Sequence, residues 1–184
     1  MSLTSLALGL AYAGHAGQFR HDGVTPYITH PLRVFRMLSM MSPQIRATAL
    51  IHDLMEDNPA ITPEVLLQSG LDPVVVAAAG YLTRQKDQPY AHYIEVIIGD
   101  KDGLSYTKGQ NIAALVKVVD IIDNMMDSPT PSMVKRYYKA LHVIMRAFPN
   151  LTHMMTDISR PDMAPNGNLL EVWQEMLANP KLNS

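Results

Sequence analysis

The sequence contains no cysteine. Disulfide frameworks, thiolate metal sites and cysteine nucleophiles are therefore all excluded. Any metal ion bound by this chain must be held by histidine and carboxylate side chains. That donor set favours ions such as Mn, Fe, Zn or Mg over softer metals.

The sequence also lacks a strong excess of either charge and lacks long apolar runs. Its formal net charge is −2 and it has no long Lys/Arg run, so we expect no nucleic-acid partner. No apolar run approaches the roughly 20 residues that span a membrane. The apolar stretch 5–13 has no basic residue before Arg20, which favours a first helix over a signal peptide. We expect a cytoplasmic protein without a membrane segment.

What the chain does contain indicates a well-packed helical domain. It has 184 residues, of which 47% are hydrophobic and 17% charged, so residues 1–184 are expected to form a single domain with a sizeable core. Helix-start signals recur, each an N-cap residue followed by proline, at Ser42-Pro43, Thr62-Pro63 and Asp72-Pro73. Residues 74–76 alone could suggest a strand, but the preceding cap and the alanines that follow favour helix.

No pair of segments alternates as strands would, so we predict an all-α fold, a compact bundle of about eight to ten helices. The predicted helices cover residues 3–17, 32–41, 43–57, 63–70, 74–83, 90–99, 111–127, 133–148 and 169–177. Residues 101–109 are expected to form a loop or short turn. Trp173 is expected to anchor the last helix.

Residues 51–58 concentrate chemistry in one place. His52, Asp53, Glu56 and Asp57 put four ionisable side chains into six residues, at the end of an apolar helical run. On a helix these positions fall within an arc of roughly 140°, so all four can point into one cavity. Burying such a cluster is costly unless a metal ion or a reaction requires it.

Two residues far away in the sequence complete a possible metal shell. His30 lies at a predicted helix start, just before Pro31, and Asp120 interrupts an apolar helix. Together with His52 and Asp53 they supply two imidazoles and two carboxylates, which leaves room for water on a metal ion. For His30 alone, a simple helix-capping role is about equally well supported.

Glu56 and Asp57 lie one turn beyond the proposed ligands. A carboxylate at that place can take a proton from a water on the metal or orient that water. The alternative is a solvated acidic helix end. It explains Glu56 less well, because Asn58-Pro59 already stops the helix.

A polar stripe and a basic loop add further candidates. Lys117, Asp120 and Asn124 fall within an arc of about 60° on an apolar helix, so they need internal partners. Asp123 and Asp127 lie beside this stripe, and we interpret both as a solvated edge.

The loop before the second helix carries Arg20, His21, Gly23 and Tyr27, which could receive a phosphate group. A surface arginine in a polar loop is the simpler alternative. His15 faces the same loop and could support the site from behind.

Four motifs in order resemble the HD-type hydrolase domain of the RelA/SpoT homologues, closest in size to the small alarmone hydrolases. They are His-x-Gly-Gln-x-Arg at 15–20, Gly-x-x-Pro-Tyr-Ile-x-His-Pro at 23–31, His-Asp-x-x-Glu-Asp at 52–57 and Val-Lys-x-x-Asp-x-x-x-Asn at 116–124. The match spans about residues 11–127.

The resemblance implies an all-helical enzyme with one metal ion, usually Mn²⁺. It implies that the metal ligands are His30, His52, Asp53 and Asp120. Glu56 and Asp57 match the pair that positions the attacking water, and the expected substrate contacts come from Arg20, His21, Tyr27, Lys117 and Asn124. Such enzymes remove the 3′-pyrophosphate of ppGpp or pppGpp, giving GDP or GTP and pyrophosphate. The synthetase domain of the longer relatives is absent, so this chain is expected only to degrade the alarmone.

Three positions depart from that pattern. His21 stands where the family usually has lysine, Asn58 where threonine is common, and Met126 where a basic residue often follows. Fewer positive charges favour a second hypothesis, a phosphohydrolase of another nucleotide or of NADPH. A third hypothesis is a nucleotide-binding regulatory module without turnover, against which the intact Glu56-Asp57 pair argues. The sequence leaves the metal open and is compatible with a homo-oligomer.

Overall fold

The computed structural model describes residues 1–99 and 106–151. These residues form helices joined by turns, and within them only an isolated bridge between Phe19 and Pro26 has β geometry, which confirms the predicted all-α class. The helices are α1 (Leu3–Gly14), α2 (Thr29–Met37), α3 (Pro43–Ile51), α4 (Leu54–Asp57), α5 (Pro63–Gln68), α6 (Pro73–Leu82), α7 (Tyr90–Ile98), α8 (Lys108–Met125) and α9 (Pro131–Ala147). The predicted helix 169–177 and its anchor Trp173 lie outside the described residues.

The N-cap signals act as expected. The side chains of Ser42, Thr62 and Asp72 accept hydrogen bonds from backbone N–H groups in the first turns of α3, α5 and α6. Each cap is followed by proline, which has no N–H to leave unsatisfied and whose φ already suits a helix. These local rules explain why three starts could be read from the sequence.

Several predicted boundaries differ from the structure by a few residues, and two of the differences have a clear physical cause. The helix expected over 43–57 is interrupted, because α3 ends at Ile51, residues 52 and 53 form a turn, and α4 then begins. Helix α8 begins at Lys108, earlier than predicted, because Thr107 and Gln110 form a reciprocal capping box. Because of the turn at residues 52 and 53, residues 52–57 do not lie on one continuous helix. Their side chains therefore point in other directions than the predicted helix would give them.

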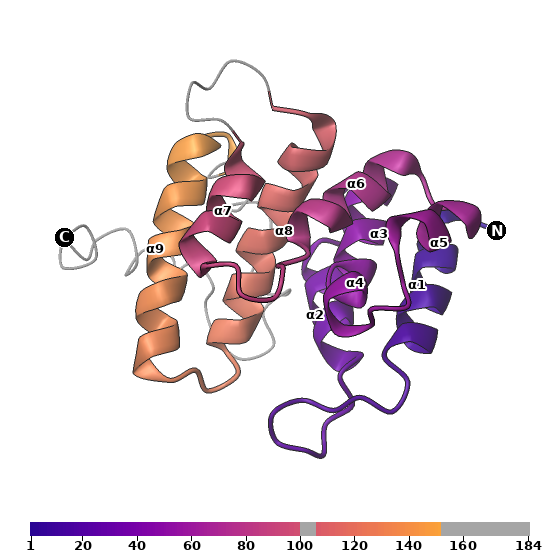
Figure 1. Cartoon of the computed structure of the whole chain (residues 1–184), viewed down its shortest axis with the longest axis horizontal. Helices are drawn as coiled ribbons and strands as arrows, with labels where there is room; N and C mark the ends of the chain where they lie inside the picture. The colour runs from indigo at the N-terminus through magenta and orange to yellow at the C-terminus, as the bar shows by residue number, and fades with distance from the viewer. Residues whose placement is uncertain (100–105, 152–184) are drawn as a thin grey trace.

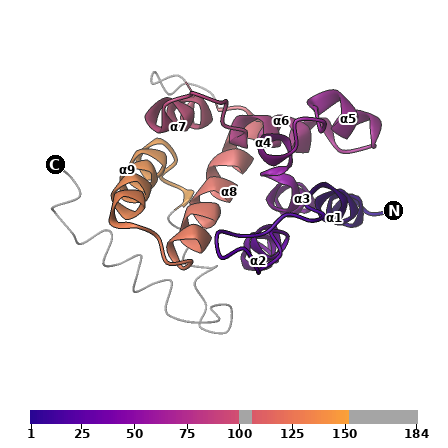
Figure 2. The ribbon, with the colours of Figure 1, turned by 60° about the horizontal axis from the view of Figure 1, so that its bottom comes forward.

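Helix α8 is the central element of the described chain. It lies between α7 and α9 on one side and α2, α3 and α6 on the other, and it contacts all five (Figures 1 and 2). Its residues between 112 and 123 are buried except Lys117, which is half-buried. A polar side chain on this helix therefore faces other protein atoms and needs a partner among them.

The buried apolar side chains form two clusters that meet at α3. The larger surrounds α8 and includes Ala49, whereas the smaller joins α1, α3, α5 and α6 and includes Leu50 and Ile51. The residue that follows Ile51 is therefore held where the two clusters join, close to α8. Among the described ranges 1–99 and 106–151, no helix combines the length and apolarity that crossing a membrane requires.

Candidate metal centre and active site

Three predicted ligands converge at the contact of α2, α3 and α8. His30 is in the first turn of α2, His52 follows the last residue of α3, and Asp120 is on α8; all three are almost fully buried. The Nε2 atoms of His30 and His52 are 3.2 Å apart. Asp120 Oδ1 lies 3.0 Å from His30 Nε2 and 3.7 Å from His52 Nε2. These three residues form a group whose ligand atoms could hold a metal ion together.

The protons on the two imidazoles can be assigned from their outer contacts. His30 Nδ1 is 2.7 Å from Asp123 Oδ2, and His52 Nδ1 is 2.9 Å from the carbonyl oxygen of Ala49. Both oxygens can only accept, so Nδ1 of each ring carries the hydrogen. In the neutral rings, both Nε2 atoms then direct lone pairs at one point, which suits a cation and is otherwise unfavourable.

Asp53 lies beside this group on the solvent side. Its Oδ2 lies 3.5 Å from His30 Nε2 and 3.2 Å from His52 Nε2, and its side chain is 19% exposed. Donor atoms bound at about 2.1 Å to one ion are about 3.0 to 3.4 Å apart, depending on the bond angle. The spacing of His30, His52 and Asp120 therefore suits a single divalent cation, and Asp53 lies beside them as a further candidate ligand.

The electrostatics agree with a site built for positive charge. Burial on its own opposes charged imidazoles, yet the neighbouring carboxylates raise the pKa of both His30 and His52 above the ordinary value. Burial likewise opposes charged carboxylates, yet Lys117 and the two histidines hold the pKa of Asp120 well below its usual range. His52 lowers the pKa of Asp53 in the same way.

Glu56 and Asp57 project from α4, directly after this group. Both are exposed in part, and Glu56 Oε2 accepts a 2.9 Å hydrogen bond from the backbone N–H of Arg84. Partial desolvation raises the pKa of both carboxyls, and the charge of Asp53 raises them further. A higher pKa makes each a better proton acceptor near neutral pH.

The polar stripe of α8 contacts one carboxylate from two sides. Lys117 Nζ lies 2.7 Å from Asp120 Oδ2, and Asn124 Nδ2 donates to Asp120 Oδ1 over 2.6 Å. Burial lowers the pKa of Lys117, but Asp120 more than compensates, so the net pKa is well above the usual value. Both residues were expected to contact substrate, and in this structure both hold Asp120.

The interpretation of Asp123 as part of a solvated edge is wrong. Its side chain is fully buried and receives hydrogen bonds from Arg33 and His30. The periodicity of α8 alone cannot show that α2 covers this position with a cation. The signal was present: Asp123 follows Asp120 by three residues, and Arg33 follows His30 by three. Asp127, in contrast, is exposed as expected.

The loop between α1 and α2 brings the remaining candidates to the site. Tyr27 donates its hydroxyl hydrogen to Asp53 Oδ2 over 2.6 Å, so this expected substrate contact holds a predicted ligand. Arg20 lies over the Tyr27 ring and donates to Asn124 and Asp127. His21 is exposed in the turn. His15 is buried, and its ring centroid lies 4.8 Å from that of Tyr27, so it packs against the loop on the side of α1.

No family model and no curated protein matches this sequence. Among solved structures, a similar one is that of a metazoan SpoT orthologue, described as hydrolysing ppGpp and acting in starvation responses. The TM-score is 0.64 at 21% identity, and the alignment covers 86% of this chain and 94% of the other. The chain has the fold of this enzyme. The compact helical bundle expected from the sequence is thereby confirmed, while at this identity the likeness carries the fold alone.

Proposed function

We propose that this protein is a metal-dependent phosphohydrolase that removes the 3′-pyrophosphate of ppGpp or pppGpp. The observation that carries the proposal is the meeting of two imidazole nitrogens and one carboxylate oxygen at one buried point, with the Asp53 carboxylate beside it. Its support is the shared fold, since the structurally similar metazoan SpoT orthologue is described as hydrolysing ppGpp. Partly exposed carboxylates beside the point supply the proton acceptors that hydrolysis requires.

The proposed roles follow from position. His30, His52, Asp53 and Asp120 would hold the ion, Mn²⁺ in this proposal, which supplies Lewis acidity at a phosphoryl oxygen. Glu56 and Asp57 would orient the attacking water and accept its proton, because the pKa of each is raised. Arg20 and Lys117 are the cations of this region that would attract the phosphates.

A second candidate is hydrolysis of another nucleotide, including NADPH. It is favoured by the state of Arg20, whose guanidinium forms an ion pair with Asp127 and also donates to Asn124. Much of its charge is thereby neutralised before any phosphate arrives. Two further positions carry less positive charge than the family pattern: His21 stands where lysine is usual, and the exposed Met126 where a basic residue often follows.

The test is an activity panel on the metal-stripped, full-length chain restored with Mn²⁺. The substrates are ppGpp, pppGpp, NADPH and deoxynucleotides, each assayed with the wild-type chain, Asp53→Ala and Glu64→Ala. Glu64 is an exposed carboxylate in the first turn of α5, so its variant controls for loss of one negative charge. We expect Mn²⁺-dependent pyrophosphate release from ppGpp by wild type and Glu64→Ala, and its loss in Asp53→Ala.

Other results would lead elsewhere. Turnover of NADPH or of a deoxynucleotide in place of ppGpp would support the second candidate. Binding of nucleotides without turnover of any would favour a regulatory module. Pyrophosphate release that persists in Asp53→Ala would remove Asp53 and its neighbours from the proposed site.

A further inference from the structure

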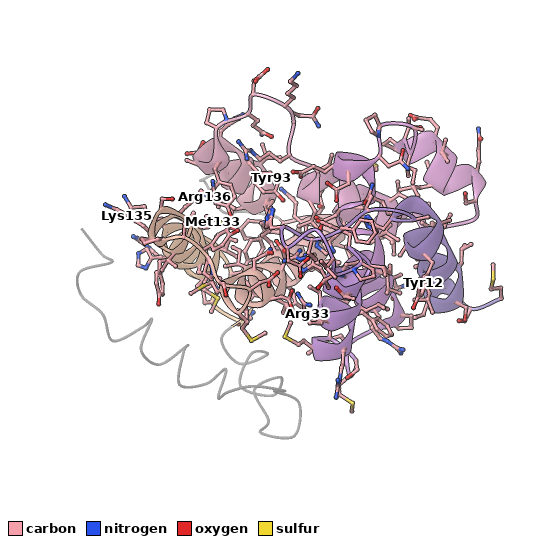
Figure 3. All side chains as sticks on the ribbon, turned by 90° about the horizontal axis from the view of Figure 1, so that it is seen from below. Tyr12, Arg33, Tyr93, Met133, Lys135 and Arg136 are labelled. Atoms are coloured by element: carbon pink, nitrogen blue, oxygen red, sulfur yellow. The ribbon has the colours of Figure 1, made fainter. Side chains whose placement is uncertain are left out.

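A chain of contacts leads from His30 in the proposed centre through Asp123 to Arg33 at the surface. Neither Asp123 nor Arg33 has a role in the proposed function. His30 Nδ1 lies 2.7 Å from Asp123 Oδ2. Arg33 donates to the same carboxylate through Nε to Oδ1 over 2.7 Å and through Nη2 to Oδ2 over 2.8 Å. In Figure 3 Arg33 lies at the side of the helical body where α2 meets α8.

This arrangement fixes the carboxylate completely. Both oxygens of Asp123 are used, and the two parallel bonds from one guanidinium set the plane of the carboxyl group. The remaining acceptor direction on Oδ2 points at His30. With its plane fixed and its side chain fully buried, Asp123 has no freedom to leave the imidazole.

The two helices contribute in matched pairs. Helix α2 carries both His30 and Arg33, and α8 carries both Asp120 and Asp123, each pair separated by three residues. One turn of α2 thus faces one turn of α8 through two contacts that share His30. Nε2 of that ring meets Asp120, while Nδ1 meets Asp123.

A purely structural role explains these residues poorly. The ion pair of buried Asp123 with partly exposed Arg33 contributes little net stability, because desolvating the carboxylate costs about as much as the attraction returns. An apolar pair of similar size would join the helices at least as well. The carboxylate becomes necessary only when the imidazole must keep its hydrogen on Nδ1 and its lone pair on Nε2.

We propose that Asp123 and Arg33 are positioning residues for the metal ligand His30. Asp123 holds the imidazole in the tautomer and orientation that aim Nε2 at the ion, and Arg33 holds Asp123 in place. The proposal rests on the metal centre argued above. It assigns a role in that centre to two side chains outside the donor set.

The experiment measures Mn²⁺ binding to the metal-stripped, full-length chain by titration calorimetry, independently of turnover. Asp123→Asn keeps the size of the side chain but loses its charge and the pair of hydrogen bonds that the carboxylate accepts from Arg33. We expect it to bind Mn²⁺ about 10- to 100-fold more weakly than wild type. Arg33→Ala should weaken binding by a smaller factor and Arg33→Lys should restore part of it. In the Asp123→Asn background, Arg33→Ala should add little.

Two controls separate positioning from general destabilisation. Leu115→Ala removes a buried apolar side chain from the same helix without touching His30, so its Mn²⁺ affinity should equal that of wild type even though it unfolds more easily. His52→Ala tests the centre itself. If Asp123→Asn does not fold, Arg33→Ala still tests the proposal, because Arg33 is 38% exposed and its replacement leaves the core intact.

The outcomes distinguish the two proposals. If wild type binds no Mn²⁺, or His52→Ala binds it equally well, the metal centre and the positioning role both fall. If His52→Ala loses binding while folded Asp123→Asn and Arg33→Ala keep wild-type affinity, only the positioning role is overturned. Equal weakening in Leu115→Ala would also overturn it, because the effect would then follow stability rather than the contact to His30.

Discussion

Each donor atom at the centre is held by a second contact on its own side chain or carboxyl group. His52 Nδ1 is fixed by the carbonyl of Ala49, and Asp53 receives the hydroxyl of Tyr27. Asp120 is held by Lys117 and Asn124. Such outer contacts orient ligands before the ion arrives, which reduces the free energy needed to order them on binding.

Glu56→Gln and Asp57→Asn test the proposed proton acceptors. Each change keeps the shape of the side chain but removes its basicity, so we expect kcat on ppGpp to fall by roughly 10²- to 10⁴-fold. Mn²⁺ affinity should stay near that of wild type, because neither carboxylate belongs to the donor set. Steady-state kinetics and calorimetry on the same preparations check the two expectations.

The matched control for these variants is Glu64→Gln, an isosteric change at an exposed carboxylate of α5, which should leave kcat unchanged. A loss of Mn²⁺ binding in Glu56→Gln would instead place Glu56 in the donor set. Wild-type turnover in both single variants and in their combination would contradict the assigned role.

The sequence was enough to predict which polar residues share one face of α8. The stripe of Lys117, Asp120 and Asn124 follows from helical geometry, and both Lys117 and Asn124 contact Asp120. Asp123 was misjudged because its partners, His30 and Arg33, are about 90 residues away in the sequence. Helical periodicity reports which residues share a face and says nothing about what covers that face.

At the scale of elements, the turn at residues 52 and 53 explains how one short segment serves two purposes. Helix α3 directs His52 into the protein, where it is buried, and α4 restarts with Glu56 and Asp57 toward solvent. The sequence contains no proline or glycine at this break, so local rules predicted a continuous helix. Packing of both apolar clusters on α3 and Leu54, rather than a local signal, determines where α3 ends.

Thr107→Ala tests whether the capping box sets the start of α8. The change removes the side-chain oxygen that accepts from the backbone N–H of Gln110, and we expect a loss of about 1 kcal/mol in the free energy of unfolding. Urea denaturation of the metal-free chain measures it. Thr107→Ser keeps the hydroxyl and should remain close to wild type.

Because the cap lies several turns before Asp120, Mn²⁺ affinity should not change in Thr107→Ala. Stability equal to wild type would show that packing alone, without the capping box, holds the first turn of α8.

For the whole molecule, the proposed centre joins segments that are far apart in sequence. His30 belongs to α2, His52 follows α3, and Asp120 lies on α8. Figure 2 shows α2 and α3 on one side of the central helix α8. The sequence predicted these elements and proposed the ligands, since each lies in a recognisable local pattern. It could not give their approach to within 3.0 to 3.7 Å, which depends on how α2 and α3 pack against α8.

A metal ion bound at this junction must therefore stabilise the whole fold, because it binds only when the three segments are packed together. At an Mn²⁺ concentration about 100 times Kd, the expected gain is about 2.7 kcal/mol, or a rise in Tm of about 5 to 11 °C for a chain of this length. Differential scanning calorimetry with Mn²⁺ and then with a chelator measures the rise and its reversal. Asp120→Ala should show no rise, whereas Glu64→Ala should show all of it. A rise of equal size in Asp120→Ala would mean that Mn²⁺ acts elsewhere on the chain, and the junction would then have to be explained by hydrogen bonding among its own side chains.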